Sequence, residues 1–298
     1  MHTLSDIQIP TQDTLATIGF FDGVHIGHQF LLNELKFLSQ KFGFQSLIVS
    51  FVNHPQEILR NRTDLKLLTT TSEKLARFEI LAIDNCLLLE FDEQIAKMSS
   101  CDFLKMLHDN YRVRKLLVGY DHHFGSDRLA TFEDYVEIGK SIGVDVIACR
   151  PFVAENLTVS SSKIRTLLQK GEVIKANELL GSPYMMSGVV VSGDQIGRKI
   201  GFPTANLKLD ISKLVPKEGV YAVEVAFKNQ WFKGMLNIGT RPTVSGDTQT
   251  IEVYIIDFEQ DIYGETLQLK FLRRIRDERK FDSIIELKSQ LEIDKLSI

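Results

Sequence analysis

Residues 14–28 read Thr-Leu-Ala-Thr-Ile-Gly-Phe-Phe-Asp-Gly-Val-His-Ile-Gly-His. The first five are apolar or β-branched, which is typical of a buried strand, and residues 30–38 carry apolar side chains at helical spacing. The motif Gly19–His28 is therefore predicted to form a strand-to-helix turn. Free backbone N–H groups and the helix dipole at such a turn attract phosphate.

Two histidines open the predicted helix on one face, because His25 and His28 are three residues apart. Gly27 between them leaves the backbone bare, so a bulky anion can come close. Donors placed there meet the charge that develops on an α-phosphorus during in-line displacement, which is the chemistry of a nucleotidyl transferase. The plain alternative is a capping or surface histidine, but the combination with two glycines and an aspartate favours phosphate chemistry.

The letters of residues 25–28 also match the first signature of class I aminoacyl-tRNA synthetases, and residues 97–100, Lys-Met-Ser-Ser, imitate their second. Cys101 and Asp102 stand where that second signature requires Lys-Ser, and the spacing is too short for a synthetase core. We reject this interpretation. Residues 99–102 precede apolar side chains at helical spacing, which predicts an ordinary helix start.

The composition excludes several classes of protein. A chain of 298 residues is long enough for two domains, and its net charge of −4 shows no footprint of nucleic-acid binding. Cys86, Cys101 and Cys149 are widely spaced, so neither a zinc site nor a disulfide framework is predicted. The start of the chain lacks the pattern of a leader, and no apolar run is long enough for a membrane. We expect a soluble, cytoplasmic protein; the oligomeric state is not indicated.

Strand-like and helical patterns alternate up to about residue 150, which predicts a parallel sheet with helices on both faces. The expected strands cover 14–20, 44–51, 86–91, 115–119 and 144–149, and the expected helices lie near 27–42, 72–82, 101–110 and 131–142. Ligands bind at the carboxyl ends of such strands. Residues 22–28, 53–55 and 119–125 follow three of these strands and are the candidate site segments.

The pattern changes near Pro183. Residues 160–181 predict two short helices, after which short strands separated by turn residues predict an antiparallel β-barrel with a last helix at about 283–291. The expected strands are 188–193, 219–227, 231–238, 250–258 and 266–272. We therefore expect two domains, residues 1–182 and 183–298.

A second informative segment runs from Gly193 to Asn206 and carries glycines at 193, 197 and 201. Thr204 and Asn206 offer two hard oxygen ligands that face one way if the segment is extended. The physical chemistry alone leaves a phosphate loop and a Gly-rich hairpin equally open. No Gly-x-x-x-x-Gly-Lys-Ser/Thr sequence occurs, so any kinase chemistry is not that of a P-loop.

Glu252 lies in a predicted strand whose residues alternate between two faces, with Ile251 and Val253 on the face opposite to it. Such a carboxylate most commonly points to solvent. If its face lines the mouth of the barrel, Glu252 is a candidate general base.

With both constellations in view, the sequence resembles the bifunctional prokaryotic riboflavin kinase/FMN adenylyltransferase (FAD synthetase) family along nearly the whole chain. The matching motifs are Gly19–His28, Ser160-Ser-Ser-Lys-Ile-Arg165, Gly197–Asn206, Gly219-Val-Tyr, Asn237-Ile-Gly-x-Arg-Pro-Thr, Tyr263-Gly264 and Ile275-Arg-x-Glu-x-Lys-Phe281, in family order. The resemblance implies a Rossmann-like nucleotidyltransferase domain followed by a riboflavin kinase β-barrel.

The resemblance also implies the reaction and the roles of residues. Riboflavin and ATP would give FMN, and FMN and ATP would then give FAD and pyrophosphate. His25 and His28 would stabilise the transferring α-phosphoryl group, and Glu252 would orient and deprotonate the ribityl 5′-hydroxyl. The nucleotide-binding residues would be Gly19, Phe21, Asp22, Gly23, Gly27, Asp121, Ser161, Ser162 and Arg165. Gly197 and Gly201 would form the kinase phosphate loop, and Thr204 and Asn206 would hold Mg²⁺ and ATP phosphates.

Departures from the family pattern lie in the first domain. Asn53 replaces the first proline of Pro-His-Pro, His122 and His123 stand within Asp-Phe-x-Phe-Gly, Ser162 replaces threonine, and Ala130 replaces glycine. A riboflavin kinase with a weak or vestigial first domain is therefore an alternative. A flavin-binding regulator without turnover is a second one, against which the reactive side chains of His25, His28 and Glu252 argue.

Overall fold

The structure is a computed structural model that describes the chain except residues 5–8, 63, 120–122, 128, 130, 153–157, 194–196, 198–199, 229 and 244–245; the side chains of residues 241–248 also lie outside the description. The chain forms two compact units. One comprises residues 1–65 and 74–158, and the other comprises residues 66–73 and 159–298.

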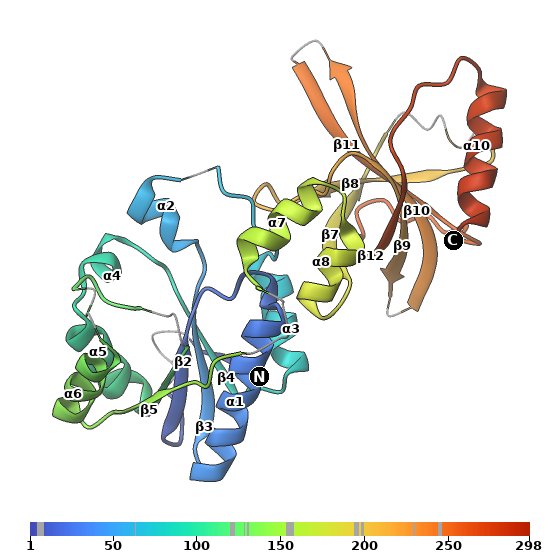
Figure 1. The fold of residues 1–298 in the computed structure, drawn as a ribbon. Coiled ribbons are helices and arrows are strands. Elements are labelled where there is room, and N and C mark those ends of the chain that lie inside the picture. The colour runs from blue at the N-terminus through green and yellow to red at the C-terminus, as the bar shows by residue number, and fades with distance from the viewer. Residues whose placement is uncertain are drawn as a thin grey trace. The chain divides into compact units, whose positions relative to one another are not determined.

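The first unit contains a parallel sheet in the order β1-β4-β3-β2-β5-β6. Figure 1 labels its strands β2, β3, β4 and β5. The strands are β1 (His2–Leu4), β2 (Thr14–Ile18), β3 (Gln45–Phe51), β4 (Asn85–Leu89), β5 (Val113–Val118) and β6 (Asp145–Ala148). Because β2 pairs with β3 on one side and β5 on the other, the direction of strand addition reverses there. Such a switch point opens a crevice at the carboxyl ends of the strands.

Helices cover both faces of this sheet, as the sequence predicts. Successive strand residues are buried on opposite faces of the sheet, since Leu47 and Val49 of β3 belong to one apolar cluster and Ile48 belongs to the other. α1 (Ile26–Phe42) and α3 (Thr71–Ile80) contribute side chains to the cluster with Ile48, and α5 (Ser100–Tyr111) and α6 (Phe132–Ile142) contribute to the other. The predicted helix start at 99–102 is confirmed, because the Ser99 side chain accepts a hydrogen bond from the Asp102 N–H.

Three short elements of the first unit were not predicted: β1, α2 (Pro55–Arg60) and α4 (Glu93–Lys97). α2 begins with an unusual cap, because the His54 side chain accepts from the Gln56 N–H and Glu57 accepts from the His54 N–H. This cap fixes the chain directly after β3, at the carboxyl edge of the sheet.

The second unit is built around a closed antiparallel barrel in the order β10-β11-β8-β7-β12-β9. Its strands are β7 (Tyr184–Val191), β8 (Thr204–Leu209), β9 (Gly219–Phe227), β10 (Gln230–Thr243), β11 (Gly246–Ile255) and β12 (Thr266–Arg276). The predicted barrel and its terminal helix, α10 (Ile284–Leu296), are confirmed. β8 was not predicted as a strand, although its extended form was one of the alternatives for Thr204 and Asn206.

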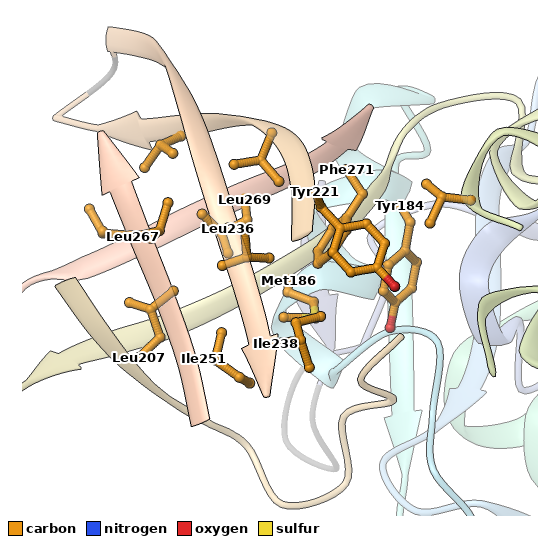
Figure 2. Packing of buried hydrophobic residues seen from close by; sticks show 14 of the residues in the cluster. Tyr184, Met186, Leu207, Tyr221, Leu236, Ile238, Ile251, Leu267, Leu269 and Phe271 are labelled. Atoms are coloured by element: carbon orange, nitrogen blue, oxygen red, sulfur yellow. The ribbon is translucent and has the colours of Figure 1, made fainter. Parts of the chain in front are cut away.

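The barrel core is aromatic at one point, where Tyr184, Tyr221 and Phe271 meet with ring centroids 5.3–5.8 Å apart (Figure 2). The predicted helices near 160–181 are α7 (Ser161–Gln169) and α8 (Val173–Leu180), and both pack into this core. Their buried side chains are Ile164, Leu168, Val173, Ala176, Leu179 and Leu180. The division of activities at residues 182/183 stays a prediction.

Residues 66–73 belong to the second unit through a buried ion pair. The Lys213 ammonium lies 2.5 Å from a Glu73 carboxylate oxygen, and the two side chains are 1 % and 6 % exposed. Lys213 also donates to the Leu68 carbonyl, and the other Glu73 oxygen accepts from the Ser187 N–H. This short segment therefore contacts the barrel through an ion pair and through Leu68, which packs in the barrel core.

Two candidate active sites

The turn after β2 contains two residues other than glycine in the left-handed backbone conformation, which is rare for residues with a side chain. Phe21 has a φ of 56° and Val24 a φ of 43°, at the two ends of the turn that holds the short helix η1 (Asp22–Val24). Phe21 and Asp22 are each 3 % exposed. A Cβ added at Gly19 would lie 2.7 Å from the Phe21 ring, so the residue there must be glycine. Gly19, Phe21, Asp22 and Gly23 thus shape the turn, and their contact with a nucleotide stays a prediction.

The two predicted histidines lie together at the start of α1. Their rings are stacked with centroids 3.5 Å apart and planes 15° apart. His25 is the N-cap of α1, and its Nδ1 accepts from the His28 N–H at 3.2 Å. A Cβ at Gly27 would lie 3.4 Å from the His25 ring, in ordinary van der Waals contact with it.

The protonation of His25 follows from its surroundings. Burial lowers the pKa of His25 to about 4, against a smaller opposite effect of Asp22. The ring is therefore neutral at pH 7, and since Nδ1 is an acceptor, its proton is on Nε2. His25 offers a neutral N–H donor beside the phosphate-attracting helix terminus.

A cavity of about 580 Å³ opens at the same edge of the sheet. Phe20, Phe91, Met98, His123 and Phe124 contribute to its largely aromatic lining, together with His54. The Phe20 and His54 rings meet edge to face with centroids 4.5 Å apart. A cavity of this volume, lined by phenylalanine rings, aliphatic side chains and two imidazoles, suits a large aromatic ligand. Five of its lining residues, His54, Pro55, His123, Phe124 and Gly125, come from the segments 53–55 and 119–125 that were predicted as site segments.

Asn53 has a clear structural role where the family has proline. Its amide donates to the Phe91 carbonyl at 2.9 Å and its carbonyl oxygen accepts from the Phe91 N–H at 2.8 Å. This reciprocal pair joins the turn after β3 to the turn after β4, next to the cavity. Asp121 and His122 lie outside the described residues, as does Ala130.

The remaining predicted ATP-binding residues lie on α7, in the second unit. Ser160 caps this helix by accepting from the Lys163 N–H, and Arg165 donates to the Lys66 carbonyl at 3.0 Å. The part that Ser161, Ser162 and Arg165 take in binding ATP stays a prediction.

Glu252 faces a cavity of about 280 Å³ in the barrel. In the strand register it lies opposite Asn206 of β8 and opposite Asn237 of β10. The Thr204 hydroxyl donates to a Glu252 carboxylate oxygen at 3.1 Å. Glu252 therefore lines the inside of a site and does not point to bulk solvent, which was the common alternative for a strand carboxylate.

The wall opposite β8 and β11 is formed by residues to which the sequence analysis assigns no role. Arg276, Phe281, Leu287 and Leu291 line the cavity from β12, α10 and the segment between them. Arg276 is fixed by Asp294 of α10, with a 2.7 Å contact from Nη2 to Oδ2. Arg276 and Phe281 lie in the motif Ile275–Phe281, which matches the family pattern, so the sequence did contain a signal that these two residues belong to a site.

A second barrel cavity, of about 90 Å³, is lined by Thr204 together with Val190, Phe258, Asp261 and Tyr263. Thr204 lines both cavities, so the two cavities are neighbours in the barrel. Gly197 lies beside Thr204, and a Cβ there would come within 2.1 Å of the Phe202 carbonyl oxygen. Gly201 has a φ of +85°, which glycine adopts without strain.

A metal would find few ligands in either site. In the part of the chain that the structure describes, no group of three or more His, Cys, Asp or Glu side chains is arranged to hold an ion. Mg²⁺ is commonly held by one or two protein oxygens plus substrate phosphates and water. Thr204, Asn206 and Glu252 provide such oxygens in adjacent strands, so the residues present fit Mg²⁺.

A parallel sheet with a phosphate-attracting turn at its switch point, followed by a barrel with two neighbouring cavities, is the architecture of an enzyme that transfers phosphorus-containing groups. Two family models match the chain: FAD synthetase over residues 7–163 and riboflavin kinase over residues 180–298. The chain therefore belongs to the bifunctional riboflavin kinase/FMN adenylyltransferase family. It has both activities, with the FAD synthetase part first and the flavokinase part second.

Full-length relatives support this assignment. The bifunctional riboflavin kinase/FMN adenylyltransferase of Escherichia coli K12 is 37% identical over 299 residues, covering 100% of this chain and 95% of the relative. The Bacillus subtilis enzyme of the same description is 35% identical, covering 95% and 90%. These relatives are bifunctional, so they favour neither the vestigial first domain nor the regulator without turnover.

A solved structure supports the fold. The crystal structure of a Streptococcus pneumoniae protein described as a macrolide-efflux protein matches with a TM-score of 0.87 and 31% identity, covering 99% of this chain and 98% of that one. Among the residues described here, no helix is long and apolar enough to span a bilayer.

Proposed function

We propose that the turn after β2 transfers the adenylyl group and that the cavity at Glu252 accepts riboflavin for phosphorylation. The observation that carries the second assignment is the position of Thr204 between two cavities. An acceptor alcohol on the Glu252 side and a nucleotide on the other side would approach the transferred phosphoryl group from opposite directions. Phosphoryl transfer requires such an in-line arrangement.

For adenylyl transfer, the aromatic cavity at Phe20 and His54 would hold the isoalloxazine of FMN. An FMN phosphate oxygen attacks the α-phosphorus of ATP, the bond to the bridging oxygen breaks, and pyrophosphate leaves. His25 and His28 would donate N–H groups to the charge that builds up on the α-phosphoryl oxygens. Asp121, Ser161, Ser162 and Arg165 would hold ATP and the departing pyrophosphate.

For phosphorylation, Glu252 would accept the proton of the ribityl 5′-hydroxyl as its oxygen attacks the γ-phosphorus of ATP. The Thr204 hydroxyl donates to one carboxylate oxygen of Glu252, so it orients the carboxylate. Thr204 and Asn206 would hold Mg²⁺, which supplies charge neutralisation for the phosphates. Gly197 and Gly201 would let the loop approach them closely. We expect this work to be done in the cytoplasm on small molecules, with no nucleic-acid or membrane partner.

The test exchanges one residue in each site and measures both reactions. Glu252→Gln keeps the size of the side chain but cannot take the proton, so riboflavin phosphorylation falls about a hundredfold to ten-thousandfold while added FMN still becomes FAD. His28→Ala does the reverse, and FAD formation falls about a hundredfold to a thousandfold.

Each variant has a control of the same residue type in the same unit. Glu224→Gln alters a barrel carboxylate on β9, and His108→Ala alters a histidine on α5. Both controls should leave both rates within about twofold. Equal loss of the two activities in either test variant would show a role in folding, and an unchanged kinase rate in Glu252→Gln would remove Glu252 as the base.

A further inference from the structure

Lys74 of α3 is a buried cation to which neither of the two proposed reactions assigns a role. Its side chain is packed inside the first unit, with 2 % of the residue exposed. The ammonium donates to the Phe51 carbonyl at 2.8 Å, to the Phe20 carbonyl at 3.1 Å and to the Ser50 hydroxyl at 3.1 Å. All three protons of the ammonium therefore have partners.

These acceptors lie at the carboxyl ends of the neighbouring strands β2 and β3. Phe20 directly precedes the turn with His25 and His28, and Phe51 is two residues before Asn53. The Ser50 hydroxyl also donates to the Phe20 carbonyl at 3.3 Å. One ammonium thus fixes the separation of the turn that carries the phosphate chemistry and the turn that carries His54.

Lys74 also supports the wall of the flavin-sized cavity. Its ammonium lies 4.2 Å from the centroid of the Phe20 ring, and the same ring contacts His54. A cation against an aromatic face is attractive, so it restrains the ring as well as the backbone of Phe20. Phe20 and His54 both line the cavity.

Burying this charge is costly, which argues against a purely space-filling role. Burial lowers the pKa of Lys74 to about 8, although Cys86 of β4 and Asp22 of η1 act in the opposite direction. Methionine would fill a similar volume without that cost. A positive charge under a turn that binds phosphates has a use that methionine lacks, because it favours anions above it.

We propose that Lys74 is a positioning residue for adenylyl transfer, holding the wall at Phe20 and His54 in a fixed relation to the phosphate-binding turn. The proposal rests on FMN binding in the cavity at Phe20. It predicts an effect on FMN recognition and not only on the amount of folded enzyme.

The test is Lys74→Met in the full chain, with steady-state rates of both reactions. The KM for FMN in FAD formation should rise about tenfold or more and kcat should fall, because small displacements of a site are expensive. The KM and kcat for riboflavin should stay within about twofold. Partial unfolding alone would lower the apparent kcat for FAD formation and leave the KM for FMN unchanged.

Two further variants keep the test decisive. Ser50→Ala removes one acceptor and one donor of the network and should raise the KM for FMN about two- to tenfold even if Lys74→Met does not fold. Lys213→Met, which alters a buried lysine of the second unit, should not change that KM. The proposal would be overturned if the KM for FMN stayed within about twofold of that of the unmodified enzyme in every folded variant of Lys74 and Ser50. Failure of FMN binding in this cavity would instead appear as unchanged FAD formation on replacing Phe20 or His54 by Ala.

Discussion

Removing either partner of the ion pair between Glu73 and Lys213 should strongly destabilise the second unit. The charged atoms of the pair are 2.5 Å apart and its side chains are nearly inaccessible. Removing one partner of a buried pair leaves an uncompensated charge and typically costs about 3–5 kcal/mol. That is a large part of the roughly 5–15 kcal/mol that stabilises a typical domain. Lys213→Met should therefore lower the urea midpoint of the second unit markedly, and Glu73→Gln should do so to a similar degree.

The double variant is the sharper measurement. Once both charges are gone, neither is left buried alone, and the amide oxygen that Glu73→Gln introduces can still accept from the Ser187 N–H that Glu73 binds. The combined loss should therefore be smaller than the sum of the single losses by at least about 1 kcal/mol. Purely additive losses would show that the two charges do not stabilise one another.

The chain provides its own probe for this experiment. Trp231, its single tryptophan, lies in β10 of the second unit. Its fluorescence follows the unfolding of that unit even if the first unit unfolds separately. The matched control is Lys175→Met, because Lys175 and Glu172 also lie 2.5 Å apart but are 67 % and 35 % exposed. Loss of this pair should change stability by no more than about 1 kcal/mol. Equal losses for Lys213→Met and Lys175→Met would refute the reasoning from burial.

Three other expectations concern the pH dependence of stability, the Arg276 side of the Glu252 cavity, and the residues that the kinase unit needs. Since the pKa of His25 is lowered from 6.5 to about 4, the stability of the first unit should be full above pH 6.5 and fall by about 3 kcal/mol as the pH drops to 4. Hydrogen exchange of α1 amides measures this, and His25→Asn should flatten the slope. Asp294→Asn removes the buried partner of Arg276 and should raise the KM for riboflavin about tenfold with FMN adenylylation unchanged. The control is Glu265→Gln, which removes an exposed pair with Lys228 away from this cavity; equal effects of the two variants would contradict a role of Arg276 in the cavity wall. The fragment 159–298 should fold and phosphorylate riboflavin. Its urea midpoint should be higher than that of the fragment 184–298, because α7 and α8 bury six apolar side chains in the barrel core. Equal urea midpoints of the two fragments, measured by Trp231 fluorescence, would contradict this expectation.

The parts of the fold that could be predicted are those encoded by local patterns. β3 (Gln45–Phe51) is an apolar run of strand length, and α1 (Ile26–Phe42) shows clear helical spacing, so both lie within a residue or two of their predicted bounds. β8 (Thr204–Leu209) lacked such a signal. It is a strand because β7 and β11 pair with it from distant parts of the sequence. α2 (Pro55–Arg60) was missed because a histidine, and not Ser, Thr, Asp or Asn, caps it.

The residues of the candidate sites also fall into those that a local sequence pattern predicts and those that only the tertiary structure brings together. His25 and His28 lie in one contiguous motif, so their proximity follows from helical spacing. The cavity at Phe20 was predicted only in part, through the segments 53–55 and 119–125, because the rest of its lining comes from the ends of other strands and helices. Lys74 was out of reach for a different reason: a lysine in an amphipathic helix is normally a solvated residue, and only the tertiary structure shows three buried acceptors around it.

The positive φ angles of Phe21 and Val24 bear on how this enzyme responds to selection. Left-handed backbone costs a bulky or β-branched residue on the order of 1–3 kcal/mol. Val24 is also buried in the apolar cluster with Leu32 and Ile48, and glycine there would lose about 1.5–3 kcal/mol of burial. A laboratory population selected for heat resistance alone should therefore gain little from glycine at position 24. A population that must also make its own FAD should keep valine, because a more flexible turn no longer presents the α1 N-terminus and its histidines in one fixed arrangement.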